Sequence, residues 1–352
     1  MSGGLDSSVA AFLLLKQGYD VIGITIKTWD YEMSGIENYR DTSCCSLESI
    51  NDARNLAVQL GFPHYVMDMK DDFERIVVKN FIDEYIAGRT PNPCVICNKF
   101  FKWDALLKKA FQLGCHYIAT GHYAKIHCEN ERYFIRKASD DKKEQSYVLW
   151  KLTQEHLRHT LFPLGNYNKT QIREIAVENR FDSIVNKRES YDICFIPDND
   201  YRSFLRRRLP DLDQKLEGGN FIDKNNLILG RHDGYPFYTI GQRKGLKIAV
   251  GEPLYVNHID PVNNTVKLGF KDELMTNEMV VSEINFMKYT SLDNPLKVTS
   301  KVRYHDEGAE SYIIERDGKI QVTFPAGVTS VTPGQSAVFY EGDDLVGGGI
   351  IC

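Results

Sequence analysis

The sequence predicts an α/β fold for the first part of the chain, followed by a small central domain and an antiparallel β-barrel. Between residues 1 and about 125, short runs rich in β-branched residues alternate with amphipathic stretches. This alternation is typical of a parallel sheet with crossover helices. In about the last eighty residues, evenly spaced alternating runs are separated by turn residues, which indicates a small barrel.

The elements of the parallel sheet follow one another along the first part of the chain. They are expected as strands at 21–26, 65–67 and 117–120 and as helices at 46–60, 73–87, 101–113 and 170–179. The first of these helices starts with a Ser-x-x-Ser cap. Ligands of such sheets gather at the carboxyl ends of the strands, so the loop at 2–8 and residues 28–29 and 121–122 mark the expected site.

We expect three domains, at residues 1–203, 204–275 and 276–352. The stretch from about 145 to 205 is mostly helical, and the composition then shifts to Gly, Asp, Asn and short apolar runs. The barrel strands are expected at 298–304, 311–315, 320–324 and 336–340. A chain of 352 residues is long enough for two or three domains with cores of their own.

The composition is that of an ordinary globular protein, with 42% hydrophobic and 26% charged residues. The net charge of −5 argues against binding nucleic acid over the whole surface, so such a partner would need a local basic patch, for which 202–208 and 231–247 are candidates. There is no long apolar segment and no signal peptide, which predicts a cytoplasmic protein without a membrane partner. In that compartment the eight cysteines are not expected to form structural disulfides.

The most specific local feature is the opening loop. It consists of Ser2, Gly3, Gly4, Leu5, Asp6, Ser7 and Ser8 and leads directly into an apolar helical run at 9–15. Adjacent glycines let the backbone approach a ligand closely, and the hydroxyl residues favour a helix start that presents N–H groups to an anion. No Gly-Lys-Ser/Thr follows, so the loop is not of the Walker A type. A Ser/Gly turn that only caps a helix is the alternative.

A buried strand normally precedes such a loop, near the centre of the sheet, whereas this sequence begins at the loop. We therefore expect the first strand to be missing, either because the start codon is assigned too late or because the strand is truly absent.

Cys97 is the strongest candidate for a reactive thiol. Pro91 and Pro93 predict a loop before it, so that Cys97 would lie near the start of the next helix, with Lys99 and Lys102 close by. A helix N-terminus and nearby cations both lower the pKa of a thiol. This position favours reactivity over the alternative of a small buried apolar residue.

Two further cysteines are considered together with Cys97. Cys94 and Cys97 have the Cys-x-x-Cys spacing of a redox pair or of two metal ligands, and Cys194 is the other well-placed thiol. Three thiolates that leave one iron open would form a 4Fe–4S arrangement. For Cys44 and Cys45, a role in packing is at least as well supported as a functional role. The remaining cysteines are not part of a motif.

Several further motifs occur in order along the chain. They are Cys44-Cys45-Ser46, Asn92-Pro93 with Cys97-Asn98-Lys99, Thr120-Gly121-His122-Tyr123, Lys143-x-Gln145-Ser146-Tyr147, Ile193-Cys194-Phe195-Ile196, the stretch 239–246 (TIGQRKGL), the stretch 332–338 (TPGQSAV) and the terminal 347–351 (GGGII). Together with the opening loop, this series resembles the bacterial tRNA-specific 2-thiouridylases of the PP-loop ATP pyrophosphatase superfamily. The resemblance spans nearly the whole chain and implies a PP-loop nucleotide domain, a small central domain and a C-terminal β-barrel.

The resemblance implies 2-thiolation of the wobble uridine of tRNA. ATP would lie on the loop 2–8, near the backbone of Ile26 and Gly121, and AMP would be transferred to the uracil O2 while pyrophosphate leaves with Mg²⁺. Cys194 would carry sulfur as a persulfide, received from a sulfur-relay protein or a cysteine desulfurase. Cys97 would then act as the nucleophile that releases the product, leaving a Cys97–Cys194 disulfide for a cellular reductant.

The resemblance also implies contacts with the anticodon arm of tRNA. The residues expected to meet the target base are Asn92, Pro93 and Cys94, and those expected to meet the rest of the tRNA are His122, Lys143, Glu144, Gln145, Arg303, Tyr304 and Gln335. Recognition of one arm requires only a local surface, which agrees with the modest net charge.

One departure from the family concerns Cys94, where better-known members carry an aspartate. With Cys97 and Cys194 it would complete the three-cysteine set of iron–sulfur-dependent thiolases, in which a cluster holds the sulfur. The sequence is also compatible with a tRNA-binding protein whose catalytic domain has decayed. It is compatible, too, with a different adenylating enzyme similar to argininosuccinate or GMP synthetases, which need no paired thiols.

Overall fold

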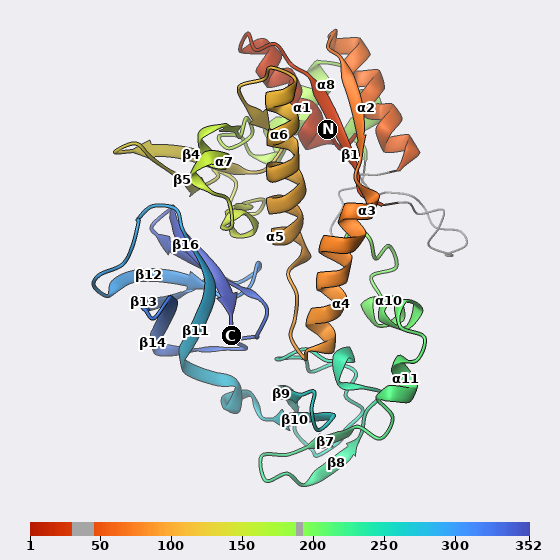
Figure 1. Ribbon diagram of the computed structural model, residues 1–352, viewed down its shortest axis with the longest axis vertical. Helices are drawn as coiled ribbons and strands as arrows, with labels where there is room; N and C mark the ends of the chain where they lie inside the picture. Colours follow the sequence, from red (N-terminus) through yellow and green to blue (C-terminus); the bar gives the residue numbers. More distant parts are fainter. Residues whose placement is uncertain (30–45, 188–192) are drawn as a thin grey trace. The chain divides into compact units, whose positions relative to one another are not determined.

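The structure is a computed structural model that describes residues 1–29, 46–187 and 193–352 (Figure 1). The chain divides into two compact units. The first unit consists of residues 1–77, 94–199 and 343–345, and the second of residues 78–93, 200–342 and 346–352. This division into two units does not test the three domains expected from the sequence, so their boundaries stay a prediction.

The first unit has the expected α/β organisation. Helix α1 (Leu5–Lys16) begins inside the opening loop, with Gly4 as its N-cap, and so starts earlier than the expected helical run at 9–15. Strand β1 (Gly23–Lys27) pairs in parallel with β2 (His64–Asp68). A second parallel pair joins β3 (Ile118–Ala119) to β6 (Thr160–Leu161). Among the described residues these two pairs are not hydrogen-bonded to each other. The carbonyl of Met1 accepts a hydrogen bond from Thr25 of β1 at 2.7 Å, so the chain just before the loop runs beside β1.

Helix α2 (Leu47–Leu60) lies between the first two strands along the chain, and it confirms the predicted cap at its start and the predicted range. The Oγ of Ser46 accepts a hydrogen bond from the backbone N–H of Ser49 at 3.0 Å, which satisfies one of the unpaired donors at a helix start. Gly61 ends the helix with φ of 78°, a left-handed conformation that glycine adopts without penalty.

The middle helices differ from the sequence expectation. In place of one helix at 73–87, the chain forms α3 (Lys70–Phe73), the π-helical η2 (Glu74–Val78) and α4 (Lys79–Ile86). The next helical run begins earlier than expected, with α5 (Pro93–Cys97) continuing into η3 (Asn98–Ala105) and α6 (Leu106–Gln112). The predicted loop at 91–97 is therefore wrong from Pro93 onward, because proline is well suited to the first position of a helix.

The rest of the first unit contains a hairpin that was not predicted from the sequence, formed by β4 (Ala124–Glu129) and β5 (Arg132–Lys137). It is followed by η4 (Ser146–Leu149), α7 (Gln154–Arg158), α8 (Lys169–Glu178) and α9 (Asp182–Val185). The main core of the unit gathers apolar side chains of α1, α2 and α8, among them Val9, Leu56 and Ile172. This core fixes α1, and with it the opening loop, whose last residues form the first turn of α1.

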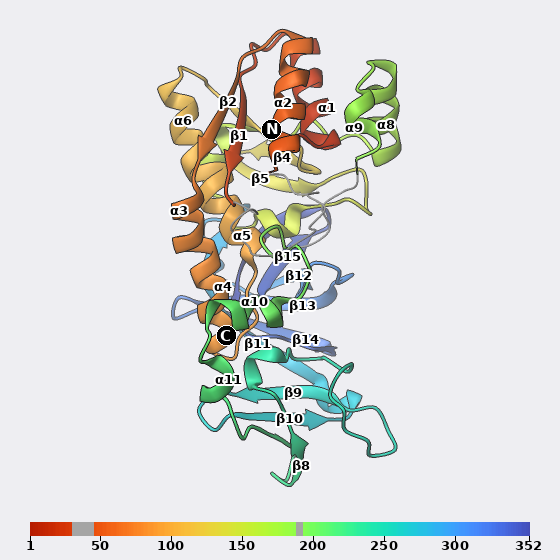
Figure 2. The ribbon, with the colours of Figure 1, turned by 90° about the vertical axis from the view of Figure 1, so that its right-hand side faces the viewer.

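The second unit starts with α4 and includes α10 (Tyr201–Arg208) and α11 (Leu212–Lys215). Its first sheet has the order β8 (Ile228–Arg231), β7 (Asn220–Ile222), β10 (Thr265–Gly269) and β9 (Tyr255–Asp260). Strands β9 and β10 lie side by side (Figure 2). Along the chain, the short helix η5 (Tyr235–Phe237) precedes β9, and η6 (Lys271–Leu274) follows β10.

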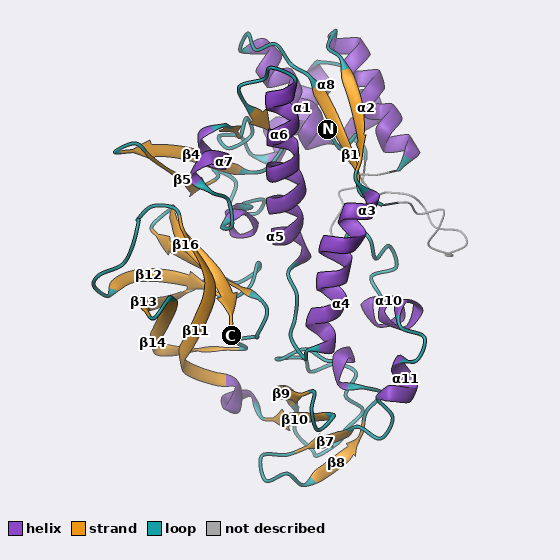
Figure 3. Cartoon of the chain, in the orientation of Figure 1, coloured by secondary structure: helices purple, strands orange, loops and turns teal. Residues whose placement is uncertain are grey.

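The last strands of the chain form the predicted antiparallel barrel (Figure 3). They are β11 (Met275–Phe286), β12 (Leu296–Lys301), β13 (Ala309–Arg316), β14 (Lys319–Thr329), β15 (Ser336–Glu341) and β16 (Asp344–Ile351). The hydrogen-bonded order is β11-β14-β13-β12-β15-β16, and pairing of Val281 with Ile351 closes β11 onto β16. Buried Val298, Ile313 and Phe339 belong to the core that fills the interior. No helix in the described ranges has both the length and the hydrophobicity to cross a membrane.

Candidate functional site

The opening loop is held by its own hydroxyl groups. The Oγ of Ser7 accepts a hydrogen bond from the N–H of Ser2 at 3.1 Å, and the Oγ of Ser8 donates to the carbonyl of Gly4 at 2.9 Å. Gly3 has φ of 64°, and a Cβ built there would lie 2.0 Å from the carbonyl oxygen of Ser49. The position therefore admits only glycine, and the loop lies directly against the first turn of α2.

Gly121 approaches the same loop from the end of β3. A Cβ at this position would lie 2.8 Å from the carbonyl carbon of Asp6 and 2.9 Å from the amide nitrogen of Ser7. The structure thus brings the two glycine-containing segments together at the N-terminus of α1. Ile26 lies in β1, the strand that runs beside Met1. This arrangement presents backbone N–H groups of a helix start, which is the usual way to bind an anion without a basic side chain.

Asp6 is the charged residue of the loop and is tied to two other side chains. Its carboxylate accepts hydrogen bonds from the hydroxyl of Tyr123 at 2.8 Å and from the Nζ of Lys169 at 2.8 and 2.9 Å. The Lys169 side chain is only 10% exposed, whereas that of Asp6 is 33% exposed. Lys169 was not predicted from the sequence, where its only local signal is its position at the start of a helix capped by Asn168.

His122 lies in the interior and not at an open surface. Only 8% of the residue is exposed, its Nδ1 lies 2.8 Å from the Thr120 hydroxyl, and its ring is 5.6 Å from that of Trp103. Burial holds the pKa of the imidazole well below its usual value, and Lys102 acts in the same direction. The imidazole is therefore neutral at neutral pH, and the expected direct contact of His122 with tRNA has little exposed surface to support it.

The neighbouring residues at 143–145 are engaged in local structure. The side-chain oxygen of Gln145 accepts from the backbone N–H of Tyr123 at 3.0 Å, and the carboxylate of Glu144 accepts from the N–H of Ser146 at 2.6 Å. Gln145 therefore holds the backbone that follows Gly121 and His122. Lys143 lies in the turn just before these residues, and its expected contact with tRNA stays a prediction.

Cys97 is partly exposed and ends the first turn of the helical run that starts at Pro93. Cys97 thus lies near the start of a helix, as predicted, but the unpaired N–H groups of the helix start lie nearer to Cys94. Asn98 is buried and donates from its side chain to the carbonyl of Val148 at 2.9 Å. This hydrogen bond fixes the rotation of the helix just after Cys97.

Cys194 lies in a turn closed by a hydrogen bond of 2.9 Å from the Ile196 N–H to the Ile193 carbonyl. The next residue, Phe195, is 2% exposed, and its ring centroid lies 5.7 Å from that of Phe73. The ring of Phe73 in turn lies 5.5 Å from that of Phe101, about one helical turn after Cys97. We call Phe195, Phe73 and Phe101 the aromatic cluster. It joins the turn of Cys194 to the helix of Cys97 within one unit.

Cys94 differs from these two thiols. The residue is exposed, and desolvation by the surrounding protein atoms raises the pKa of its thiol, which Lys102 offsets only in part. The thiol is therefore accessible and protonated at neutral pH. Nowhere in the described ranges do three His, Cys, Asp or Glu side chains gather in a way that could hold a metal ion. The three cysteines of the expected cluster are thus not arranged as a ligand set. Cys44 and Cys45 lie outside the described residues.

In the second unit, Gln335 contacts the segment that leads to Asn92 and Pro93. Its side-chain nitrogen donates to the carbonyls of Thr90 at 3.1 Å and Pro91 at 2.9 Å. The backbone N–H of Thr90 also donates to the carbonyl of Pro333 at 2.9 Å. Gln335 is therefore engaged with the protein backbone, although its sequence-based role was a contact with tRNA.

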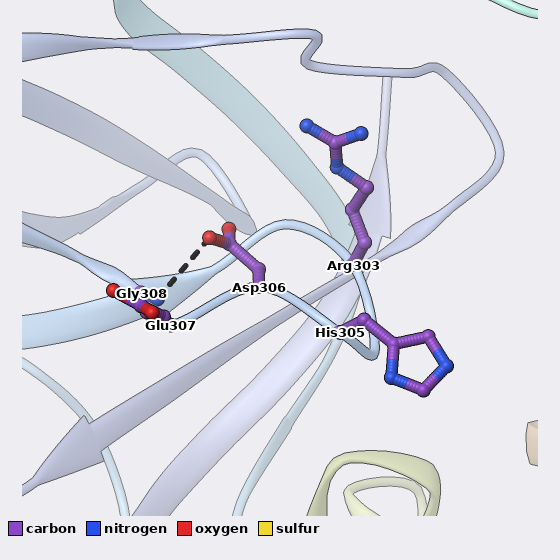
Figure 4. Close-up of a pocket in the computed structure, with 5 residues that line it drawn as sticks. All are labelled: Arg303, His305, Asp306, Glu307 and Gly308. Atoms are coloured by element: carbon purple, nitrogen blue, oxygen red, sulfur yellow. Dashed lines mark hydrogen bonds between the residues drawn. The ribbon is translucent and has the colours of Figure 1, made fainter.

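Arg303 lines a shallow cavity of about 490 Å³ on the barrel. The other lining residues are His305, Asp306, Glu307 and Gly308. Asp306 is turned toward the backbone N–H of Gly308, at 3.2 Å, and the Arg303 side chain extends away from it (Figure 4). Tyr304 lies in the same turn, with its ring 4.8 Å from that of His305. In the basic patch expected at 202–208, Arg206 forms an ion pair of 2.9 Å with Asp213, and its guanidinium lies over the ring of Phe237.

Comparison with known proteins covers the whole chain. Three family models match in order: the tRNA methyl transferase HUP domain over residues 1–198, the tRNA methyl transferase PRC-barrel domain over 202–269 and the aminomethyltransferase β-barrel domain over 276–351. The chain is 54% identical to the tRNA-specific 2-thiouridylase MnmA of Amoebophilus asiaticus, over 100% of this chain and 93% of the relative. It is 52% identical to the protein of the same name from Cytophaga hutchinsonii, over 100% and 95%, and 50% identical to that from Salinibacter ruber, over 100% and 92%.

Proposed function

Because this chain belongs to the tRNA-specific 2-thiouridylase family, we propose that it is a tRNA sulfurtransferase that uses ATP to form 2-thiouridine at the wobble position. The observation that carries the mechanism is the aromatic cluster, which joins the helix of Cys97 to the turn of Cys194 in the unit that also holds the opening loop. Two thiols far apart in sequence are needed in one place for sulfur transfer, and this packing supports that requirement.

The first step that we propose is adenylation of the base. The loop at 2–8 and the backbone at Gly121 would receive ATP, with Ile26 beside the adenosine, and the uracil O2 would attack the α-phosphorus so that pyrophosphate leaves. Mg²⁺ would neutralise charge on the phosphates. Both oxygens of Asp6, the carboxylate of the loop, already accept hydrogen bonds from Lys169, so we assign no protein ligand to this ion.

In the second step, the terminal sulfur of a persulfide on Cys194 attacks C2 of the activated base, and AMP leaves with the former O2. The thiolate of Cys97 then attacks the Sγ of Cys194 and breaks the S–S bond, so that the sulfur stays on the base. The product is a Cys97–Cys194 disulfide, and two electrons from a cellular dithiol reopen it. A sulfur-relay protein or a cysteine desulfurase in the cytoplasm would reload Cys194.

The resemblance to the family assigns Asn92, Pro93 and Cys94 to the target base and Arg303, Tyr304 and Lys143 to the tRNA. The persulfide route is favoured over an iron–sulfur cluster because the described cysteines do not gather as a ligand set. Protein that is free of iron and still thiolates tRNA would remove the cluster mechanism.

The test uses the purified full-length chain with tRNA, ATP, a sulfur donor and a dithiol, and it measures 2-thiouridine by mass spectrometry of tRNA digests. We expect Cys97→Ser and Cys194→Ser to abolish the product and Cys128→Ser, an exposed cysteine on β4, to leave it unchanged. Full activity in the two site variants would favour a different adenylating enzyme. Tight tRNA binding with no stabilisation by ATP would favour the decayed tRNA-binding protein.

A further inference from the structure

The contact between Asp6 and Lys169 leads to an inference about the nucleotide site, and it rests on the proposed use of ATP. Asp6 lies in the first turn of α1, at the end of the helix where the loop would receive phosphate. A carboxylate there competes with the phosphates for the same positive helix end and repels them. The site therefore needs a cation that neutralises Asp6.

Lys169 supplies this cation, and its backbone is held in place by two sets of contacts. It is the first residue of α8, its backbone N–H donates to the carboxylate of Asp140 at 2.8 Å, and the preceding Asn168 caps the helix. Its Nζ bridges both oxygens of Asp6, and the Tyr123 hydroxyl adds a second donor to one of them. Because the Lys169 side chain is largely buried, this ion pair is screened less than one at the surface.

Three segments of the first unit meet at this contact: the opening loop, the residues that follow Gly121, and the start of α8. Tyr123 is itself 2% exposed and belongs to the main core of the unit. The Asp6 side chain is therefore held from two sides, by Tyr123 and by Lys169.

We propose that Lys169 is a positioning residue of the nucleotide site: it neutralises Asp6 and holds it aside, so that the start of α1 stays open to the polyphosphate of ATP. In this proposal Lys169 acts through Asp6 and does not itself contact the phosphates. This distinguishes it from the phosphate-binding lysine of a Walker A loop, which contacts the nucleotide directly.

The test is calorimetric titration of the full-length chain with ATP and, separately, with inorganic pyrophosphate, at low salt. We expect Lys169→Met to weaken both ligands by about tenfold or more, because an unneutralised carboxylate remains at the site. Lys169→Arg should restore most of the affinity. The double variant Asp6→Asn with Lys169→Met removes both charges and should bind pyrophosphate more tightly than Lys169→Met alone. Lys297→Met is the matched control, since Lys297 forms an ion pair of 2.8 Å on the exposed barrel surface.

Two results would overturn the inference while leaving the proposed function intact. One is wild-type affinity in Lys169→Met. The other is a double variant as weak as Lys169→Met, which would mean that Lys169 binds phosphate itself. A wild-type chain that binds neither ATP nor pyrophosphate would instead overturn the proposed function, and the inference with it. Thermal unfolding of each variant separates loss of the site from loss of the fold.

Discussion

The side-chain amide of Gln335 lies 2.9 Å from the carbonyl oxygen of Pro91 and donates a hydrogen bond to it. The same nitrogen reaches the carbonyl of Thr90, so one amide group satisfies two consecutive backbone acceptors. Gly334 packs equally closely, since a Cβ there would lie 2.9 Å from the Thr90 carbonyl oxygen. The turn between β14 and β15 therefore holds the segment that continues into Asn92 and Pro93.

Replacing Gln335 should loosen this segment. Gln335→Ala removes two hydrogen bonds, and Gln335→Glu also places a carboxylate against two carbonyl oxygens, so we expect destabilisation of about 1–3 kcal/mol, larger for the glutamate. Thermal unfolding measures this, and Gln59→Ala is the control, because Gln59 makes an exposed contact of 3.5 Å with the carbonyl of Asn179. A glutamate variant as stable as the wild type would contradict the role of the amide.

The thiol of Cys94 should be dispensable for sulfur transfer, because serine keeps a small polar side chain at this position, which is assigned to the target base. This exposed, protonated thiol is not grouped with Cys97 and Cys194 as a ligand set, so Cys94→Ser should keep 2-thiouridine formation within about twofold of the wild type. The measurement is the rate of product formation under anaerobic conditions, with an iron assay of the same sample. Loss of both iron and activity in Cys94→Ser would restore the cluster mechanism.

Phe195 should determine how well the turn of Cys194 is held. Phe195→Ala leaves a cavity beside Phe73 and should cost about 3–5 kcal/mol, whereas Phe195→Leu should cost clearly less. We also expect slower formation of the Cys97–Cys194 disulfide in Phe195→Ala, measured by peptide mapping after turnover without reductant. An unchanged disulfide rate in a folded Phe195→Ala variant would show that the aromatic cluster does not align the two thiols.

Much of this architecture could be predicted from local sequence patterns. The cap at Ser46, the end of that helix at residue 60 and the antiparallel strands of the barrel each depend on neighbouring residues, and the structure confirms them. The start of the helix at Pro93 was missed because a proline both breaks a helix interior and favours a first helical position. Lys169 was missed for another reason: its partner Asp6 is 163 residues away, and no local pattern encodes such a contact.

His122 should make the protein less stable in mild acid. Burial keeps the folded-state pKa of His122 well below 6.5, so above that pH the residue is neutral in both states and has no effect. As the pH falls below about 6.5, the unfolded chain binds a proton that the folded chain does not, and stability falls. His122→Gln should therefore flatten the loss of unfolding free energy between about pH 6.5 and 5. An equal slope in the variant and the wild type would contradict the burial of a neutral imidazole.

The last prediction concerns the opening loop itself. Gly3→Ala combines a left-handed backbone with a Cβ that would meet the Ser49 carbonyl oxygen at 2.0 Å, so the loop must move away from α2. Gly18→Ala is a matched control, because Gly18 also has positive φ, at 86°, but a Cβ there meets no atom within 4 Å.

We expect Gly18→Ala to cost about 1–2 kcal/mol in stability and to bind ATP normally. Gly3→Ala should lose ATP affinity by about tenfold or more, because the N–H groups of the loop are displaced from the start of α1. Calorimetric titration with ATP and thermal unfolding of both variants separate the two effects. If Gly3→Ala bound ATP as tightly as Gly18→Ala, the nucleotide would not lie on this loop, and the assignment of residues 2–8 to the phosphates would be wrong.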